Sequence, residues 1–199
     1  MKHLLLLVCV SAFVISANAQ ATPKPASDMT VFGLTLGEPL SIPECPKSGD
    51  TSYKSSATVC YRLNAFDGDK LDDVNRYIIF PFNDSPSISK FNVVPALVLD
   101  GKLEGIGFNT NGTQNDEAVL EKLKEKYGEP TTIKRGTVQN RLGATFNKFT
   151  AIWLFSNLYV GFQSVTTKID SGLVNIDTTK GFNYREAKLK ELTKDKRPL

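Results

Sequence analysis

Residues 93–108 read VVPALVLDGKLEGIGF, two apolar runs joined by Asp100-Gly101. An Asp-Gly pair between such runs favours a two-residue type I′ turn, so this stretch predicts a β-hairpin. The turn fixes a register that pairs Leu99 with Lys102, Val98 with Leu103, Ala96 with Gly105 and Val94 with Gly107. Glycines weaken a strand unless a neighbour approaches closely. We therefore expect a helix or an aromatic ring to pack on the face that carries the two glycines.

A helix is expected directly after this hairpin. Thr113 or Asn115 is suited to cap its first turn, and Gly128 followed by Pro130 ends it. Acidic residues in the first turn and lysines in the last turn match the helix dipole. The apolar stripe of this helix consists of Val119, Leu120, Leu123 and Tyr127. This spacing predicts a central helix with one face on the sheet.

Apolar runs and turn residues place the other elements. They predict strands at residues 31–36, 59–63, 74–82, 131–134, 144–149 and 173–178, and a second hairpin from 151–155 and 158–165. Asn183 with Glu186 forms a capping box, which predicts a C-terminal helix to about Lys194. The order indicates an α+β fold with a largely antiparallel sheet, built from two hairpins plus flanking strands, one central helix and a C-terminal helix.

The second hairpin is apolar on both faces. Its side chains include Trp153, Phe155, Leu158 and Tyr159, which we take as candidate contact residues for a protein partner. A plain hydrophobic core is the better-supported alternative for the same four residues.

The N-terminus has the pattern of a secretory signal. Lys2 and His3 precede an apolar run from Leu4 to Ile15, and Ala17-Asn18-Ala19 offers the small residues of a cleavage site. The run is too short to span about 30 Å of hydrocarbon, and no later stretch predicts a transmembrane segment. We therefore expect a periplasmic or secreted protein. Its predicted parts are a signal peptide at 1–19, a flexible leader at 20–30, a single domain at 31–195 and a basic tail at 196–199.

Cleavage after Ala19 leaves two cysteines, Cys45 and Cys60. In an oxidising compartment they most simply form one disulfide across the polar segment 46–59. Redox-active pairs usually stand at C-x-x-C spacing, which this pair does not have. The pattern predicts a structural disulfide, for which loop-entropy models give about 3 kcal/mol.

The only histidine of the chain, His3, lies in the predicted signal. The mature chain thus has no histidine base for a Ser-His-Asp or Cys-His triad, and zinc or copper loses its usual nitrogen ligand. No glycine-rich phosphate loop is present. We expect no cofactor and no enzyme activity, since proton transfer would depend on carboxylates, lysine or tyrosine.

Four aspartates, Asp67, Asp69, Asp72 and Asp73, cluster in the sequence DGDKLDD. Oxygen ligands at alternate positions suit calcium, which makes these residues weak calcium candidates. The EF-hand pattern fails here because Leu71 and Asp72 occupy its fifth and sixth positions. An acidic hairpin loop is the simpler interpretation, and no metal site is predicted.

The C-terminus is basic, with seven lysines or arginines and three acids from Lys180 onward. The candidate electrostatic contacts are Lys188, Lys190, Lys194, Lys196 and Arg197. They fit a peripheral contact of the C-terminal helix with an anionic surface, although a solvated terminal helix explains them as well. Nucleic acid is not expected as a partner, because of the compartment and because no basic stripe is rich in aromatics.

Composition is that of an ordinary globular chain, with 41% hydrophobic and 23% charged residues in 199. Together with the missing catalytic constellations, this favours an exported protein that binds an envelope protein non-covalently, for example as an inhibitor or accessory factor of an envelope enzyme. The alternative is a carrier for a small molecule or lipid, with a cavity between the central helix and the face of Gly105 and Gly107. A carboxylate-based hydrolase is the least favoured class.

Overall fold

A computed structural model describes residues 23–66, 69 and 73–194. The fold is α+β: a large antiparallel sheet with two helices and a separate two-stranded sheet. The large sheet has the strand order β3-β4-β5-β6-β10-β9-β8-β7. Its strands are β3 (Cys60–Arg62), β4 (Asn75–Ile79), β5 (Val93–Leu99), β6 (Lys102–Thr110), β7 (Thr132–Gln139), β8 (Thr145–Leu154), β9 (Leu158–Gln163) and β10 (Gly172–Thr178).

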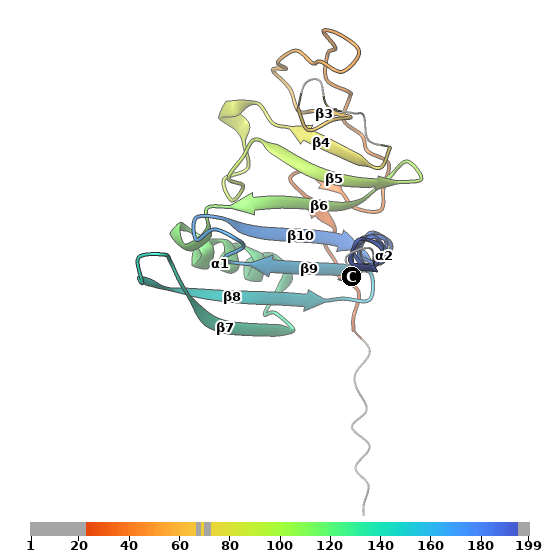
Figure 1. Ribbon diagram of the computed structural model, residues 1–199. Coiled ribbons are helices and arrows are strands. Elements are labelled where there is room, and N and C mark those ends of the chain that lie inside the picture. Colours follow the sequence, from red (N-terminus) through yellow and green to blue (C-terminus); the bar gives the residue numbers. More distant parts are fainter. Residues whose placement is uncertain (1–22, 67–68, 70–72, 195–199) are drawn as a thin grey trace, which may run out of the picture.

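The two helices lie on opposite faces of this sheet. Helix α1 (Asp116–Tyr127) is behind β9 and β10 in Figure 1, and α2 (Thr179–Lys194) lies in front of the sheet at one end of β10. The apolar stripe of α1 is buried as expected, through Val119, Leu120 and Leu123. Asn115 and Gly128 flank α1, and Gly128 has a φ of 77° that glycine adopts readily.

The main core lies between the sheet and α1. It includes Ile106 and Phe108 of β6, Val174 and Ile176 of β10, and Trp153 of β8, all at most 3% exposed. A short hairpin of β1 (Thr30–Val31) and β2 (Leu34–Thr35) closes this side of the core. The ring of Phe32 at its turn packs against Phe108, with ring centroids 5.0 Å apart.

Residues 23–30, part of the predicted leader, lie against the turn between β8 and β9. The side-chain oxygen of Asn157 accepts a hydrogen bond of 2.7 Å from the Ala26 amide. The Ser156 amide donates to the carbonyl of Lys24 at 3.2 Å. This segment is thus tied to the sheet from Lys24 onward.

The first hairpin forms where the sequence predicts it, but the expected register is wrong beyond its first two pairs. Leu99 faces Lys102 and Val98 faces Leu103, and then a β-bulge makes Leu97 face Gly105. Glu104 is the extra residue of this bulge. Its buried carboxylate accepts a hydrogen bond from the Thr178 hydroxyl, which fixes it at the end of β10. The bulge turns Gly105 and Gly107 to the face opposite α1.

Several other bounds differ from the predictions. The expected strands at 144–149 and 151–155 are one strand, β8, and the predicted strand at 131–134 extends to Gln139 in β7. The C-terminal helix begins at Thr179, and not at the capping box of Asn183 and Glu186. Its cap is Thr178, whose hydroxyl accepts a hydrogen bond of 3.1 Å from the Gly181 amide. Neither described helix has the length and apolar character that a membrane crossing requires.

Candidate functional site: the groove beneath helix α2

Helix α2 is anchored on the sheet face opposite α1 by an aromatic pair. The ring of Phe182 lies over the ring of Tyr159 of β9, with centroids 4.4 Å apart and planes inclined by 33°. This offset arrangement is favourable for two aromatic rings. The contact fixes the first turn of α2 over β9.

A partly buried ion pair fixes the second turn of α2. The Arg185 side chain donates through Nε to Oδ1 of Asp177 in β10 at 2.9 Å, and the Asp177 side chain is only 2% exposed. Burial raises the pKa of the Asp177 carboxyl, while the nearby Arg185 guanidinium acts in the opposite direction. Burial also raises the pKa of Tyr159, and Asp177 and Glu186 add to this effect.

Glycines on the neighbouring strand make room for these polar side chains. The Asp177 carboxylate lies over Gly105, and the side-chain oxygen of Asn175 is 2.7 Å from where a Cβ of Gly107 would stand. The expected close approach to these glycines is thus made by Asp177 and Asn175 of β10. Helix α2 lies on this same face, and its Arg185 guanidinium is 3.3 Å from where a Cβ of Gly105 would stand.

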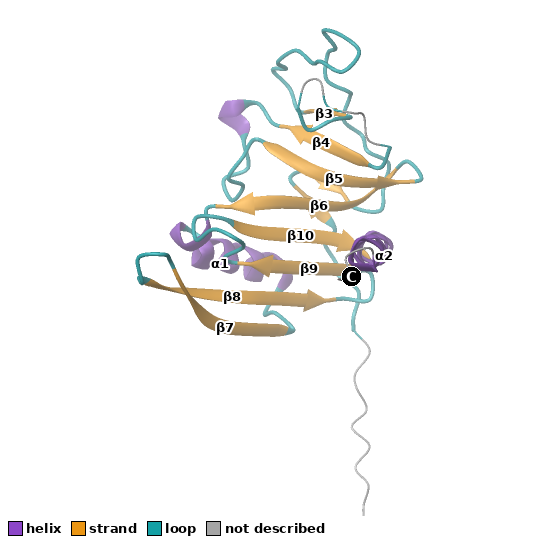
Figure 2. Ribbon diagram, viewed as in Figure 1, coloured by secondary structure: helices purple, strands orange, loops and turns teal. Residues whose placement is uncertain are grey.

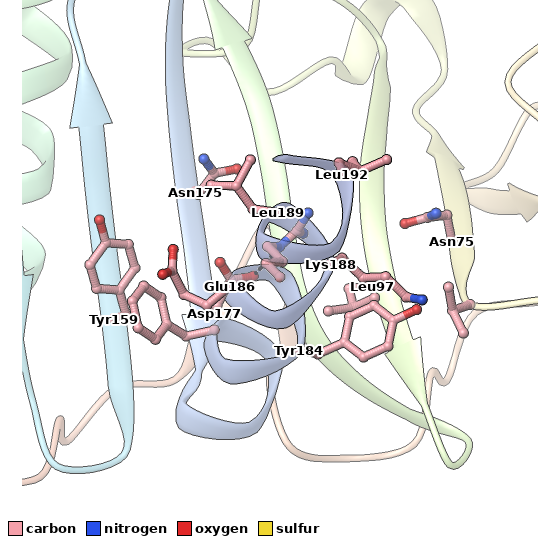
Figure 3. Close-up of a pocket in the computed structure, with 13 residues that line it drawn as sticks. Asn75, Leu97, Tyr159, Asn175, Asp177, Tyr184, Glu186, Lys188, Leu189 and Leu192 are labelled. Carbon is pink, nitrogen blue, oxygen red and sulfur yellow. Dashed lines mark hydrogen bonds and ion pairs between the residues drawn. The ribbon is translucent and has the colours of Figure 1, made fainter. Parts of the chain in front are cut away.

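Beside α2 the same face forms a groove of about 590 Å³. Val74, Asn75 and Leu97 form its sheet side, and Tyr184, Lys188, Leu189 and Leu192 form its helix side. Figure 3 shows α2 between Tyr159 on one side and Asn75 on the other. Leu189 is 56% exposed and Leu192 is 65% exposed. The groove thus combines an apolar lining with charged groups from α2.

The two carboxylates that line the groove are Asp177 and Glu186. Asp177 is held by Arg185 and is almost inaccessible, so it stabilises the position of α2 instead of facing a substrate. The chemistry that the groove offers is therefore apolar contact together with charge from Glu186 and Lys188 of α2. Lys188 itself pairs with Glu191 at 2.9 Å.

The four predicted contact residues do not share one surface. Trp153 and Leu158 are each 1% exposed and belong to the core on the α1 side. Phe155 is half-buried against Tyr127, with ring centroids 6.2 Å apart. Only Tyr159 lies on the α2 face, where it lines the groove.

The basic residues of the C-terminus divide between described and undescribed parts of the chain. Lys188, Lys190 and Lys194 lie on α2 and are exposed. Lys196 and Arg197 lie outside the described residues. The helix therefore presents at least three lysines to solvent next to the groove.

Two of the four weak calcium candidates, Asp67 and Asp72, also lie outside the described residues. Asp69 accepts a hydrogen bond from the Phe66 amide at 3.1 Å, which is a turn contact. Within residues 23–66, 69 and 73–194, no three His, Cys, Asp or Glu side chains gather as a metal site requires.

The predicted disulfide is present between Cys45 and Cys60, whose Cα atoms are 5.0 Å apart. Both cysteines are buried with Tyr53 in a small cluster separate from the main core. The Tyr53 hydroxyl donates to Glu44 at 3.0 Å and accepts from the Leu63 amide at 3.2 Å. With this burial and these neighbouring hydrogen bonds, the disulfide is a structural crosslink.

The cavity that the carrier hypothesis places between α1 and the glycine face is not formed, because the bulge at Glu104 separates the two. The space beside α1 is about 120 Å³ and is lined mainly by Phe32, Phe108, Leu123 and Tyr127. This volume is well below that of typical ligand pockets, which measure roughly 300–1,000 Å³. The larger space lies beneath α2.

Sequence reasoning missed the residues that build the groove, above all Asp177, Phe182 and Arg185. One signal was available: Asn175 and Asp177 alternate with apolar residues along β10, which marks one face of that strand as polar. That β10 pairs with the glycine strand β6 is visible only in the fold.

No family model, curated protein or solved structure matches the chain. Its function is therefore inferred from its own residues and geometry.

Proposed function

We propose that this is an exported protein that binds a protein partner non-covalently through the groove beneath α2. The observation that carries this proposal is the pair Leu189 and Leu192, which remain 56% and 65% exposed beside an apolar groove of about 590 Å³. They stand three residues apart and so lie on one side of α2. Exposed apolar side chains beside a concave surface are typical of an interaction site.

The charge of α2 indicates the kind of partner. The helix contains Lys180, Arg185, Lys188, Lys190 and Lys194, against Glu186 and Glu191 as its only acids. A partner segment with an apolar side chain for the groove and acidic residues for the lysines complements this surface. The rate of association is then expected to fall as salt screens the charges.

Two features support export. The N-terminal sequence has the pattern of a cleaved signal, and the buried disulfide Cys45–Cys60 fits an oxidising compartment. The partner is then an envelope or secreted protein. Inhibition or assistance of an envelope enzyme is the role we favour.

The rival function is carriage of a small molecule or lipid in the same groove. Its volume of about 590 Å³ falls in the range of small-ligand sites. The open position of Leu192 favours the protein partner, because a carrier encloses its ligand.

Site-specific photo-crosslinking in the producing cell tests the proposal. A photoreactive phenylalanine analogue replaces Leu192, and the matched control carries it at Phe82, which is 88% exposed on the distant helix η1 (Phe82–Asp84). A discrete adduct of protein size from position 192 and not from position 82 is the expected result. An adduct of small-molecule size supports the carrier, and identical patterns at both positions contradict a site at α2.

Purified variants then measure the groove itself against the captured partner. Leu189→Ser with Leu192→Ser is expected to weaken binding roughly tenfold or more, since both leucines lie where the partner is placed. Phe82→Ser is the control. Unchanged thermal unfolding of both variants shows that the exposed substitutions leave the fold intact, and equal affinity for the two variants overturns the proposal.

A further inference from the structure

A second surface, distant from the α2 groove, is defined by an unusual distribution of charge. Residues 130–169, which contain β7, β8 and β9, include no Asp or Glu and five basic residues. Every residue of this range is described by the structure. One third of the sheet therefore has a positive charge that no acid of the same segment offsets.

Two of these cations lie on one side of the β7–β8 hairpin. Lys134 and Lys148 are exposed and line a shallow groove of about 280 Å³ with Thr150 and Gln163. The aliphatic part of Lys148 lies over Gly136, where its Cε is 3.9 Å from the place of a Cβ. The absence of a side chain at Gly136 lets this lysine lie along the strand with its ammonium group toward solvent.

Two further cations continue the surface. Arg141 and Lys168 line a neighbouring groove of about 330 Å³ between the hairpin turn and the loop after β9. Val165 lines both grooves, so the two are adjacent. The four residues Lys134, Arg141, Lys148 and Lys168 form what we call the hairpin patch.

Two acids that neighbour this segment are already paired. Asp170 lines the second groove and bonds Lys90 at 3.3 Å, and Glu117 of α1 bonds Arg135 at 2.8 Å. Across the part of the chain that the structure describes, no cation of the hairpin patch has a carboxylate within 4.0 Å. The patch therefore presents four charges to an external anion.

An apolar side chain projects from the same hairpin. Leu142, next to Arg141 at the turn, is 93% exposed. The side-chain oxygen of Asn140 accepts hydrogen bonds from the amides of Leu142 and Ala144 at 3.0 and 2.9 Å. These two bonds stabilise the turn. Figure 2 shows this turn extending beyond the end of β9. The turn thus presents a leucine at the end of a cationic arm.

We propose that the β7–β8 hairpin docks the protein on an anionic lipid bilayer. The hairpin patch contacts the headgroups, and Leu142 enters the boundary between headgroups and acyl chains. Cations around a projecting apolar side chain are the composition of an interfacial anchor. A soluble polyanion or an acidic protein would account for the lysines but gives no role to a leucine that is 93% exposed. This surface is separate from the groove beneath α2.

Vesicle flotation tests the docking. The protein is taken as isolated from the cell that makes it, and all variants keep the same N-terminus. Vesicles of phosphatidylcholine with an equal part of phosphatidylglycerol are compared with vesicles of phosphatidylcholine alone. We expect binding to the anionic vesicles only, weakened by salt. Lys134→Gln with Lys148→Gln should lower the affinity roughly thirtyfold, and Leu142→Ser roughly tenfold.

Two control variants locate the effect. Lys54→Gln with Lys102→Gln removes the same charge from two other exposed positions and should change the affinity less than about twofold. Lys190→Gln with Lys194→Gln removes the same charge from α2. The proposal is overturned if these α2 substitutions abolish vesicle binding while the hairpin substitutions do not. It is equally overturned if Leu142→Ser has no effect and polyglutamate binds as well as the vesicles.

Discussion

The carboxylate of Asp177 occupies the space that a side chain at Gly105 would need. The two residues face each other across β10 and β6, and a Cβ at Gly105 would overlap Oδ1 of Asp177. It would also lie 3.3 Å from the Arg185 guanidinium. Gly105 is therefore required for the close approach of a partly buried ion pair that holds α2 on the sheet.

Gly105→Ala is expected to lower the free energy of unfolding by about 3 kcal/mol, because the added methyl group displaces Asp177 from Arg185. The matched control is Gly136→Ala in β7, where the new Cβ meets only the flexible end of Lys148 at 3.9 Å. That change should stay within about 0.5 kcal/mol. Urea unfolding measures both variants. Equal losses would show that close packing is not the reason for glycine at position 105.

The first hairpin shows how far its sequence predicts the fold. The turn at Asp100-Gly101 and the first two pairs are correct because they depend on local backbone preferences. The register fails at Glu104 because the bulge is stabilised by Thr178 and by a bridge between Pro39 and Lys102. These partners are distant in sequence, and nothing within residues 93–108 reports them. The glycines consequently lie on the face opposite the one expected.

The buried position of Asp177 predicts a pH effect of definite sign. Burial raises the pKa of its carboxyl in the folded protein, so the folded state retains the proton at pH values where the unfolded chain has lost it. The contribution of this group to the free energy of unfolding therefore falls as pH rises from about 3.9 through the raised pKa. The stability of the wild type relative to Asp177→Asn should fall over this range in urea unfolding at a series of pH values.

Asp100 offers a control of opposite sign. The hydrogen bond from Lys180 lowers the pKa of this exposed carboxyl. Its contribution is therefore present above the ordinary pKa of an aspartate and is lost as pH falls through the lowered pKa. The stability of the wild type relative to Asp100→Asn should rise with pH, and only slightly, because solvent screens the pair. If both stability differences changed with pH in the same direction, the raised pKa of Asp177 would be contradicted.

Trp153 is expected to behave as a core residue. It is 1% exposed, and its indole nitrogen donates to the carbonyl of Gly128 at 2.7 Å, which joins β8 to the end of α1. Trp153→Ala should lower the free energy of unfolding by about 4 kcal/mol. The neighbouring Leu154 points to the other face and is 48% exposed, so Leu154→Ala should cost less than about 1 kcal/mol. A folded Trp153→Ala variant of near-normal stability would return this residue to the list of contact residues.

The second hairpin shows why the site was harder to predict than the fold. Alternation correctly places Ala151, Trp153 and Leu158 on one face and Tyr159 on the other. Both faces are apolar, however, so the pattern does not say which one a helix covers. The position of α2 depends on the Tyr159–Phe182 and Asp177–Arg185 contacts. Each of these contacts joins a strand to α2, and the sequence does not predict the direction in which that helix runs.

The disulfide should stabilise one region more than the rest of the molecule. Cys45 and Cys60 pack with Tyr53 in their own cluster, and the amide of Cys45 bonds the carbonyl of Tyr61 at 2.8 Å. Replacing both cysteines by serine should cost about 3 kcal/mol within this cluster. Because the main core beside α1 shares no residue with it, the loss is expected to be local.

Hydrogen exchange distinguishes local from global loss in this double variant. The amides of Cys45, Tyr61 and Leu63 should exchange faster, since their hydrogen bonds lie in the cluster. Amides of β6 and β10 should keep their protection, because these strands pair with each other at the centre of the sheet. Faster exchange in β10 would mean that the cluster and the main core unfold as one unit. Unchanged exchange at Cys45 and Leu63 would mean that Tyr53 and its hydrogen bonds hold this region without the disulfide.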